Sequence, residues 1–425
     1  MKILFHNARI LTMENDQIIE GDLLVKDHRI AYIGNDAQAF APFDRVIDCR
    51  KNLLMPGFKN AHAHSAMVFL RGKADDVNLQ EWLFNIVLPR EERLLPDDVY
   101  NLNKVAYLEY LSSGITACFD HYYSFLESAK SAEEFGMRTL LLISYSPEKR
   151  SVEEMVSLFD EYNNKKEGLV RLSLGFHAEY TLDESALDGY KETLAKFNVP
   201  FYTHIAETEK EVADCFAKRG KGPAEFIYDE GLFKNGGGGF HCLYLNDKEV
   251  KIFKENHLSI VSCPASNLKL ASGIAPLTKY FNEGINIALG TDGPASNNSL
   301  DMFKEMYLAA TLQKVTNKDA SALPAFEVLK MATVNGAKAM GLDDADVLAP
   351  NKLADLIMID LSKPNMQPIN NIITNLVYAG SKDNVKLTMI NGKILYEDGQ
   401  YFVNENIEEI YRKAEEISSR LEKEL

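Results

Sequence analysis

Residues 55–64 of the chain read MPGFKNAHAH, and this stretch indicates how the rest of the sequence is organised. In an extended backbone, residues two apart point to the same side, so His62 and His64 present both imidazole rings in one direction. We expect this stretch to close the first strand of a barrel and its two rings to bind one metal ion. A lone H-x-H pair also fits two packing or surface histidines, so the metal interpretation needs support from elsewhere in the chain.

Beyond this stretch, short apolar runs alternate with helical patterns. One predicted helix begins at Asp97, after Pro96, and ends at Gly114, and another covers residues 183–196. The alternation carries no doubly wound nucleotide fingerprint, so it predicts an α/β fold of the (β/α)₈ TIM-barrel type. The later strands of this barrel are expected at residues 115–119, 139–144, 171–177, 200–204, 239–242, 258–263 and 285–290.

Both ends of the chain are rich in strand patterns instead. A tight turn is expected at Asn391-Gly392, because Asn-Gly is the strongest two-residue hairpin signal. We therefore predict a small β-sandwich domain built from residues 1–55 and 346–425, next to a catalytic barrel at residues 56–345. The predicted elements of this small domain are strands at 2–11, 23–33 (folded back at Asp27-His28), 353–360, 385–390 and 393–396, and a helix at 405–425.

Polar residues fall at the ends of several predicted barrel strands. His177, His204, His241 and Asp292 all follow apolar runs, and the carboxyl ends of barrel strands converge on one face. We predict that His204 and Asp292 join the H-x-H pair as ligands of the metal. Three imidazoles and one carboxylate leave a position open for water, as a catalytic rather than a structural site requires.

Three residues are predicted to carry the acid–base chemistry. Glu207 follows His204 by three positions, where it can take a proton from the water and deliver it to the substrate. Asp292 is expected to bind the metal through one oxygen and accept a proton with the other, and His241 to orient the water and polarise the reacting centre. The alternatives are a helix-entry carboxylate for Glu207, a turn aspartate for Asp292 and a buried structural histidine for His241.

Composition excludes several other roles. The 425 residues are 46% hydrophobic, enough for a large core, and the net charge of −16 argues against nucleic acid or membranes as partners. We see no signal peptide and no run long enough to span a bilayer. The scattered cysteines indicate reduced thiols in a cytoplasmic protein with a small-molecule substrate, and a barrel of this size is compatible with a homo-oligomer. These cysteines are Cys49, Cys118, Cys215, Cys242 and Cys263.

Taken in order, these motifs resemble the amidohydrolase superfamily over essentially the whole chain. Within it, the likeness is greatest to the 5′-methylthioadenosine/S-adenosylhomocysteine deaminases and the related triazine hydrolases. The resemblance implies hydrolytic deamination of an adenine nucleoside (5′-methylthioadenosine, adenosine or S-adenosylhomocysteine) to its inosine analogue and ammonia. It rests on Pro56-Gly57, His62-Ala63-His64, His204-x-x-Glu207, His241, Gly290-Thr291-Asp292-Gly293 and residues 266–276 and 291–298.

The resemblance also implies one divalent ion per chain, zinc or alternatively iron(II), held by His62, His64, His204 and Asp292. The lysine that bridges two metals in other relatives is missing from residues 139–144 and 172–177, which is consistent with a single ion.

The resemblance further assigns substrate contacts. Glu91 matches a carboxylate that binds the ribose hydroxyls, and a carboxylate can accept hydrogen bonds from two vicinal hydroxyls. Trp82 packs beside it, and His177 contacts the substrate together with Glu207 and Asp292. The alternatives are a core aromatic for Trp82 and a solvated charge for Glu91.

One position departs from the family. Ile143 stands where an arginine usually reaches a polar substrate tail, so we expect an apolar lining there, which argues against S-adenosylhomocysteine. Arg150 lies close in sequence and is a candidate replacement.

Other functions compete with this interpretation. The nearest is an aminohydrolase or chlorohydrolase acting on guanine-type or triazine-type rings. A non-catalytic barrel scaffold is a second alternative, although such relatives lose metal ligands and none is missing here. A purely structural metal site is a third alternative. Such a site would have four cysteine or histidine ligands and no position for water, whereas the ligands in this sequence leave a position open.

Overall fold

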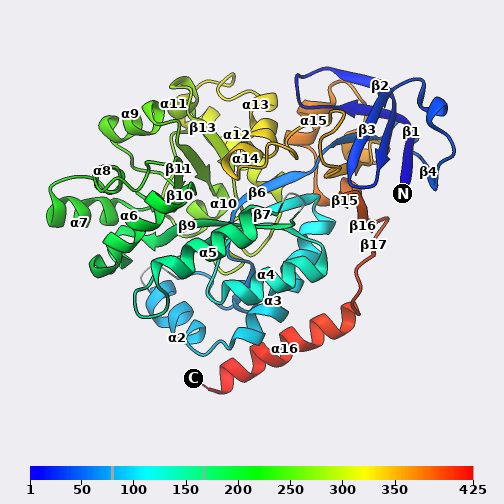
Figure 1. Ribbon diagram of the computed structural model, residues 1–425. Coiled ribbons are helices and arrows are strands. Elements are labelled where there is room, and N and C mark those ends of the chain that lie inside the picture. Colours follow the sequence, from blue (N-terminus) through cyan, green and yellow to red (C-terminus); the bar gives the residue numbers. More distant parts are fainter. Residues whose placement is uncertain (78–80, 166–167, 425) are drawn as a thin grey trace.

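The computed structural model describes residues 1–77, 81–165 and 168–424. Its central feature is an eight-stranded parallel sheet in the order β13-β12-β11-β10-β9-β8-β7-β6 (Figure 1), which confirms the predicted barrel. The two end strands meet where Ala63 forms a parallel bridge with Asp292. The strands are β6 (Phe58–Ala63), β7 (Ile115–His121), β8 (Arg138–Ile143), β9 (Val170–Ala178), β10 (Phe201–Ile205), β11 (Gly237–His241), β12 (Ser259–Ser262) and β13 (Asn286–Leu289).

Helices surround this barrel, and most of them follow a strand, as the alternating pattern predicts (Figure 1). The α-helices in the described part of the barrel region are α2 (Leu88–Glu91), α3 (Pro96–Ser112), α4 (Phe125–Phe135), α5 (Val152–Asn163), α6 (Leu187–Lys196), α7 (Glu209–Arg219), α8 (Pro223–Asp229), α9 (Asp247–Glu255), α10 (Pro264–Lys269), α11 (Leu277–Asn282), α12 (Met302–Asn317), α13 (Ala325–Met331) and α14 (Val334–Ala339). The 3₁₀-helical segments there are η2 (Ser65–Leu70), η4 (Glu179–Thr181) and η5 (Glu184–Ala186), and η3 (Trp82–Val87) is a π-helix.

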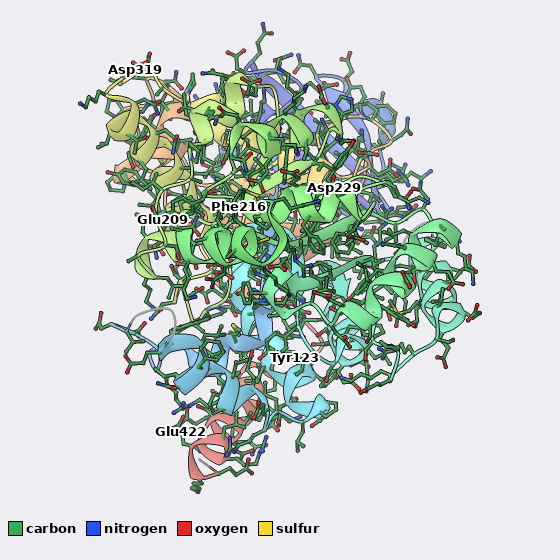
Figure 2. The ribbon with its side chains drawn as sticks, turned by 90° about the vertical axis from the view of Figure 1, so that its left-hand side faces the viewer. Tyr123, Glu209, Phe216, Asp229, Asp319 and Glu422 are labelled. Atoms are coloured by element: carbon green, nitrogen blue, oxygen red, sulfur yellow. The ribbon has the colours of Figure 1, made fainter. Side chains whose placement is uncertain are left out.

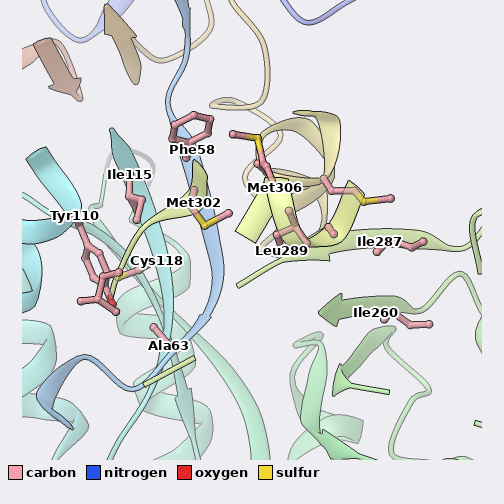
Figure 3. Packing of buried hydrophobic residues seen from close by; sticks show 14 of the residues in the cluster. Phe58, Ala63, Tyr110, Ile115, Cys118, Ile260, Ile287, Leu289, Met302 and Met306 are labelled. Atoms are coloured by element: carbon pink, nitrogen blue, oxygen red, sulfur yellow. The ribbon is translucent and has the colours of Figure 1, made fainter. Parts of the chain in front are cut away.

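Apolar side chains fill two layers, one inside the barrel and one between its strands and helices. Along β8, Leu140 and Leu142 belong to the inner cluster, whereas Leu141 and Ile143 belong to the outer one. This alternation follows from the two-residue repeat of a strand. Figure 3 shows part of the outer layer, where residues of the barrel strands pack near Met302 and Met306 of α12.

The terminal strands form a second, nine-stranded sheet in the order β17-β16-β15-β14-β5-β1-β2-β3, with β4 paired to β1. Segments from the two ends of the sequence thus lie side by side (Figure 1). The division of the chain into two domains at residues 55/56 and 345/346 stays a prediction. The elements are β1 (Lys2–Leu11), β2 (Ile18–Lys26), β3 (Arg29–Gly34), η1 (Ala37–Phe40), β4 (Arg45–Asp48), β5 (Leu53–Pro56), β14 (Leu356–Ile359), η6 (Pro364–Met366), α15 (Ile372–Tyr378), η7 (Lys382–Asn384), β15 (Val385–Ile390), β16 (Lys393–Glu397) and β17 (Gln400–Tyr401).

A buried ion pair joins the barrel to this second sheet. The Arg138 guanidinium at the start of β8 donates to both carboxylate oxygens of Asp355, which directly precedes β14. Asp355 also accepts a hydrogen bond from the backbone amide of Asn391. Burial opposes ionisation of Asp355, but Arg138 outweighs it and holds the pKa of that carboxyl below its usual range.

Replacing Arg138 by methionine is expected to lower the free energy of unfolding by about 3–5 kcal/mol, because it leaves the buried charge of Asp355 without its hydrogen-bonded partner. Urea denaturation of the metal-loaded protein measures the loss. The double variant Arg138→Met/Asp355→Asn removes the charge and keeps an acceptor for the Asn391 amide, so it should recover more than half of the loss. A loss below about 1 kcal/mol for the single variant would contradict a structural role for this pair.

A C-terminal helix, α16 (Ile407–Lys423), lies along the outside of the barrel beside α2 and α3 (Figure 1). The predicted helix ended at residue 425, which lies outside the described residues. Glu422 accepts two hydrogen bonds from Arg90 of α2, at 2.9 and 3.3 Å, and one from the Lys73 ammonium at 2.9 Å. The helix is thereby tied to the segment that precedes Glu91.

Two further observations bear on the sequence predictions. Within the residues that the structure describes, no helix combines the length and the apolar character needed to cross a bilayer. All five cysteines are free and buried, as expected for reduced thiols that act as small apolar side chains.

Candidate metal and active site

The predicted histidines meet at the carboxyl ends of the barrel strands. His62 and His64 come from the end of β6, and His204 comes from β10. The ring centroid of His62 lies 4.8 Å from the centroid of His64 and 4.8 Å from that of His204. The His64 and His204 rings are nearly parallel, with their centroids 5.5 Å apart. The ring of His241, at the end of β11, lies 5.5 Å from that of His62.

Backbone and amide oxygens fix the orientation of three of these rings. His64 Nδ1 donates to the carbonyl of His121, and His204 Nδ1 donates to the carbonyl of His177, both at 2.6 Å. Because a carbonyl oxygen can only accept, Nδ1 must carry the proton, and the neutral ring then has a free lone pair on Nε2. His241 is held in the same way by the side-chain oxygen of Asn267, at 2.8 Å. This is the arrangement that metal-binding histidines adopt.

Asp292 completes the cluster from the turn after β13. Its Oδ1 lies 3.5 Å from His62 Nε2 and 3.3 Å from His64 Nε2. Its Oδ2 accepts hydrogen bonds from the hydroxyls of Ser266, at 2.6 Å, and Ser296, at 2.9 Å. Both lone pairs of Oδ2 are therefore engaged, which leaves Oδ1 to face the cluster and disfavours the expected second role of Asp292 as a proton acceptor.

The cluster has the properties of a cation site. His62, His64 and Asp292 form one group whose ligand atoms lie within 4.8 Å of one another, and His62, His204 and His241 form another. Neither ring nitrogen of His62 has a hydrogen-bond partner among the described residues, although the side chain is fully buried. Buried polar atoms without partners are costly, and a metal ion bound to Nε2, the nitrogen that lies near Asp292, would satisfy one of them.

The acid–base properties of His62 and His204 agree with this. Burial lowers the pKa of His62 to about 3 and that of His204 well below its usual range, so both rings stay neutral, as ligands must be. Burial lowers the pKa of His64 too, but the neighbouring Asp292 carboxylate outweighs it and raises this pKa to about 9. The negative charge of Asp292 thus dominates the local electrostatics.

The backbone is strained where these side chains leave their strands. Ala206, His241 and Asp292 have positive φ angles of 50°, 68° and 59°, a left-handed region that residues other than glycine seldom adopt. Such strain gathers at functional sites, where the surrounding structure holds it in place. At residue 206 the Glu211 carboxylate supplies this support, because it accepts the backbone amides of Ala206 and Glu207, both at 2.8 Å.

Glu207 lies beside the cluster, as predicted. Its Oε2 is 4.0 Å from His241 Nε2, and its side chain is 12% exposed. Burial raises the pKa of Glu207 above its usual range, which suits a group that both takes up and gives back a proton. His241 is close enough to the cluster to act as a ligand as well as to orient water, so its non-ligand role stays a prediction.

Two further histidines line the opening, one predicted and one missed. The His177 ring, from β9, stacks on His204 with centroids 4.5 Å apart. His121, at the end of β7, lies 5.8 Å from His204 and 6.2 Å from His177. Both residues are partly exposed, although Nδ1 of each ring is buried without a hydrogen-bond partner among the described residues.

The structure places Glu91 in a buried position and gives it a partner that the sequence did not reveal. Its Oε1 accepts a hydrogen bond from the Tyr122 hydroxyl at 2.7 Å. Burial raises the pKa of Glu91 to about 7, although the Tyr122 hydrogen bond acts in the opposite direction. A solvated surface charge, the alternative considered for Glu91, does not fit a side chain that is 8% exposed.

Trp82 packs within an apolar cluster behind this carboxylate. Its indole N–H donates to the carbonyl of Ala295 at 3.3 Å, and its cluster includes Tyr122 and two residues of α16, Ile417 and Leu421. The tryptophan therefore anchors the segment that carries Glu91, and its direct contact with substrate stays a prediction.

Ile143 does not form the apolar lining that the sequence led us to expect. Its side chain belongs to the layer between strands and helices, because the alternation along β8 turns it away from the barrel interior. Its identity therefore says little about the substrate tail. The guanidinium of Arg150 lies over the Phe125 ring, 4.8 Å from the ring centroid.

Four residues that contribute to the site do not follow from the predicted strand ends. The predicted second strand stopped at residue 119, so His121 and Tyr122 fell in an expected loop, whereas β7 continues to His121. Ser266 and Ser296 were quoted only as part of longer motifs. A strand that ends in the polar pair Asp120-His121 is hard to bound by hydrophobicity, since the apolar pattern stops before the hydrogen bonding does.

Comparisons with known proteins agree with this architecture. The sequence pattern of the amidohydrolase family matches residues 53–395. The 5-methylthioadenosine/S-adenosylhomocysteine deaminase of Caldanaerobacter subterraneus subsp. tengcongensis is 37% identical and covers 99% of each chain. The 5′-deoxyadenosine deaminase of Methanosarcina acetivorans is 36% identical over 98% of this chain and 99% of its own. A crystal structure of an adenosine deaminase from Xanthomonas campestris with bound zinc superposes with a TM-score of 0.92 and 29% identity, covering 99% of this chain and 98% of its own. The chain therefore belongs to the amidohydrolase family.

Proposed function

We propose that this chain is a metal-dependent aminohydrolase that converts an adenine nucleoside to the inosine analogue and ammonia. The observation that carries the proposal is the juxtaposition of a buried histidine–aspartate cluster with the carboxylate of Glu207 at the barrel mouth. The buried carboxylate of Glu91 supports a nucleoside rather than a bare heterocycle. The deaminase names of the relatives at 36–37% identity point to the same class of substrate.

One zinc ion per chain is the metal we propose, with His62, His64, His204 and Asp292 as its ligands. The orphaned nitrogens of His62 and the free Oδ1 of Asp292 support this set. When bound, such an ion supplies Lewis-acid chemistry, which lowers the pKa of a water and fixes its position. A bridging lysine is missing from β8 and β9, which favours a single ion, and the zinc in the Xanthomonas campestris structure supports the choice of metal.

The side chains of this chain then share the proton transfers. Glu207 accepts a proton from the attacking water, whose oxygen bonds to C6, and delivers that proton to N1 of the purine. The C6–N1 double bond becomes a single bond, and C6 becomes tetrahedral. The Nδ1 atom of His241 is held by Asn267. Its Nε2 atom forms a hydrogen bond with the oxygen added to C6 and stabilises the tetrahedral intermediate. A proton passes from the added hydroxyl to the amino group, which leaves as ammonia, and the purine keeps a C6 carbonyl. His177 lies against the ligand cluster, where it can contact the base.

The ribose is the part of the substrate that Glu91 recognises in this proposal. A buried, oriented carboxylate can accept hydrogen bonds from the 2′- and 3′-hydroxyls together. A site built for hydroxyl groups rejects analogues that lack them, because its own polar group is left without a partner.

Changing Glu91 to glutamine should therefore reduce selectivity for the ribose diol. We expect kcat/KM for adenosine to fall by about 100-fold, which is the loss of hydrogen bonds to a charged group. The value for 2′,3′-dideoxyadenosine should change by less than about threefold, since this substrate never made those bonds. Steady-state ammonia release with both substrates gives the ratio of kcat/KM for adenosine to kcat/KM for 2′,3′-dideoxyadenosine. If the variant and the wild type have the same ratio, the assignment of Glu91 is refuted.

A substrate panel tests the proposed reaction as a whole. Ammonia release is measured with adenosine, 5′-methylthioadenosine, 5′-deoxyadenosine, S-adenosylhomocysteine, guanine and an aminotriazine, and metal content is determined on the same preparation. We expect turnover of at least one adenine nucleoside in proportion to bound zinc. Turnover of guanine or the triazine without any adenine nucleoside would overturn the proposal.

A further inference from the structure

His121, the last residue of β7, and Tyr122, which follows it, hold two different parts of the site. The carbonyl of His121 accepts the hydrogen bond from His64 Nδ1, at 2.6 Å, and thus orients a residue of the metal cluster. The hydroxyl of the next residue, Tyr122, donates to Glu91 Oε1 at 2.7 Å. Two consecutive residues therefore link the position of the histidine–aspartate cluster to the position of the Glu91 carboxylate.

The tyrosine that makes this link is itself held firmly. Tyr122 is 9% exposed and packs in the apolar cluster that contains Trp82 and Val87 of η3. The same cluster includes Ile417 and Leu421 of α16, so the ring is supported by a helix from the far end of the chain. A ring packed in this way keeps its hydroxyl at one point, and the hydrogen bond then fixes the carboxylate that receives it.

Glu91 depends on this bond because its surroundings are otherwise unfavourable for a charge. The side chain is 8% exposed, and a buried carboxylate is stable only if hydrogen-bond donors satisfy it. With Tyr122 on Oε1, the remaining lone pairs of the carboxylate stay available for hydroxyl groups of a ligand.

We propose that Tyr122 is a positioning residue for sugar recognition, which sets the Glu91 carboxylate at a fixed distance from the metal cluster and so determines selectivity for the ribose diol. This inference rests on the proposed function, in which Glu91 binds the 2′- and 3′-hydroxyls. Tyr122 acts through Glu91, and its effect should be confined to substrates that carry the diol.

The test is the Tyr122→Phe variant of the metal-loaded enzyme, which keeps the packed ring and removes only the hydroxyl. We expect KM for adenosine to rise about tenfold, the loss of one hydrogen bond to a charged group, while kcat stays within about twofold. KM for 2′,3′-dideoxyadenosine should be unchanged. The neighbouring Tyr123→Phe is the matched control, because that side chain is 60% exposed (Figure 2) and its variant should leave both constants unchanged.

The outcomes separate this inference from the function on which it rests. If Glu91→Gln abolishes the preference for the diol and Tyr122→Phe does not alter it, the positioning role is wrong and the proposed function stands. If Glu91→Gln also leaves the preference intact, the ribose assignment itself fails. If Tyr122→Phe raised KM equally for both substrates, its role would be merely structural and the inference would be overturned. In support of it, adding Tyr122→Phe to Glu91→Gln should cause no further change in the preference.

Discussion

Replacing Glu207 by glutamine is expected to reduce ammonia release from adenosine by about 1,000-fold or more. Glutamine has the same shape as glutamate, but it can neither take a proton from water nor return one to the purine ring. The structure shows why the loss should be chemical rather than structural. The turn around residue 207 is held by Glu211, which accepts the backbone amides of Ala206 and Glu207, and the variant leaves these bonds in place.

The measurement is kcat for ammonia release, together with zinc content and the thermal unfolding temperature of the same sample. We expect metal content and unfolding temperature to match those of the wild type. Glu209→Gln is the matched control, since this exposed residue lies at the start of α7 (Figure 2) and its variant should have wild-type activity. Near-normal ammonia release by Glu207→Gln would exclude the residue as the proton carrier.

Changing His62 to alanine is expected to abolish zinc-dependent stabilisation and to reduce kcat by roughly 1,000-fold or more, the equivalent of several kcal/mol of barrier lowering. Zinc at about 1,000 times its dissociation constant should stabilise the wild type by about 4 kcal/mol. The variant should gain close to nothing at the same zinc concentration. His62 has no hydrogen-bond partner among the described residues and stacks on Phe240 at 3.9 Å, so the substitution removes packing but no hydrogen bond.

Comparing each protein with and without zinc cancels this packing loss. The measured quantity is the difference in unfolding temperature between the zinc-loaded and chelator-treated forms. His257→Asn serves as the control, because His257 is an exposed residue with a φ of 52°, a conformation that asparagine tolerates. If zinc stabilised the His62 variant as much as the wild type, His62 would not be a ligand.

The barrel and the centre of its site could be predicted because both follow from simple periodic rules. The parallel strands are nearly continuous apolar runs, and each run that ends in a histidine or an aspartate points to the same face. His204 and Asp292 were found in this way, and the two-residue spacing of His62 and His64 required a shared direction. The same rules explain why β10 and β13 were expected within a few residues of their actual bounds.

The remaining parts of the site depend on contacts between distant segments, which no local pattern contains. The bond between Tyr122 and Glu91 joins the end of a strand to a short helix, and each residue looks ordinary in its own stretch of sequence. The two serines on Asp292 Oδ2 come from α10 and from the turn after β13, so the contacts that disfavour its second role as a proton acceptor appear only in the folded chain. The Ile143 side chain points outward because the two-residue repeat of β8 places it opposite to Leu140 and Leu142, which face the barrel interior.

The pairing of β5 with β14 has a consequence for how the protein is made in the cell. Pro56 pairs with Leu356, so roughly 300 residues must be synthesised before the second strand of this pair leaves the ribosome. At ordinary rates of translation this takes about 15–60 seconds, during which β5 has an unpaired edge. β5 leads directly into β6, the strand that carries His62 and His64. The metal-binding strand is therefore among the first parts of the barrel to be synthesised, but the neighbour that secures its entry into the barrel comes late. Until β14 is made, this edge of β5 is open to pairing with another chain.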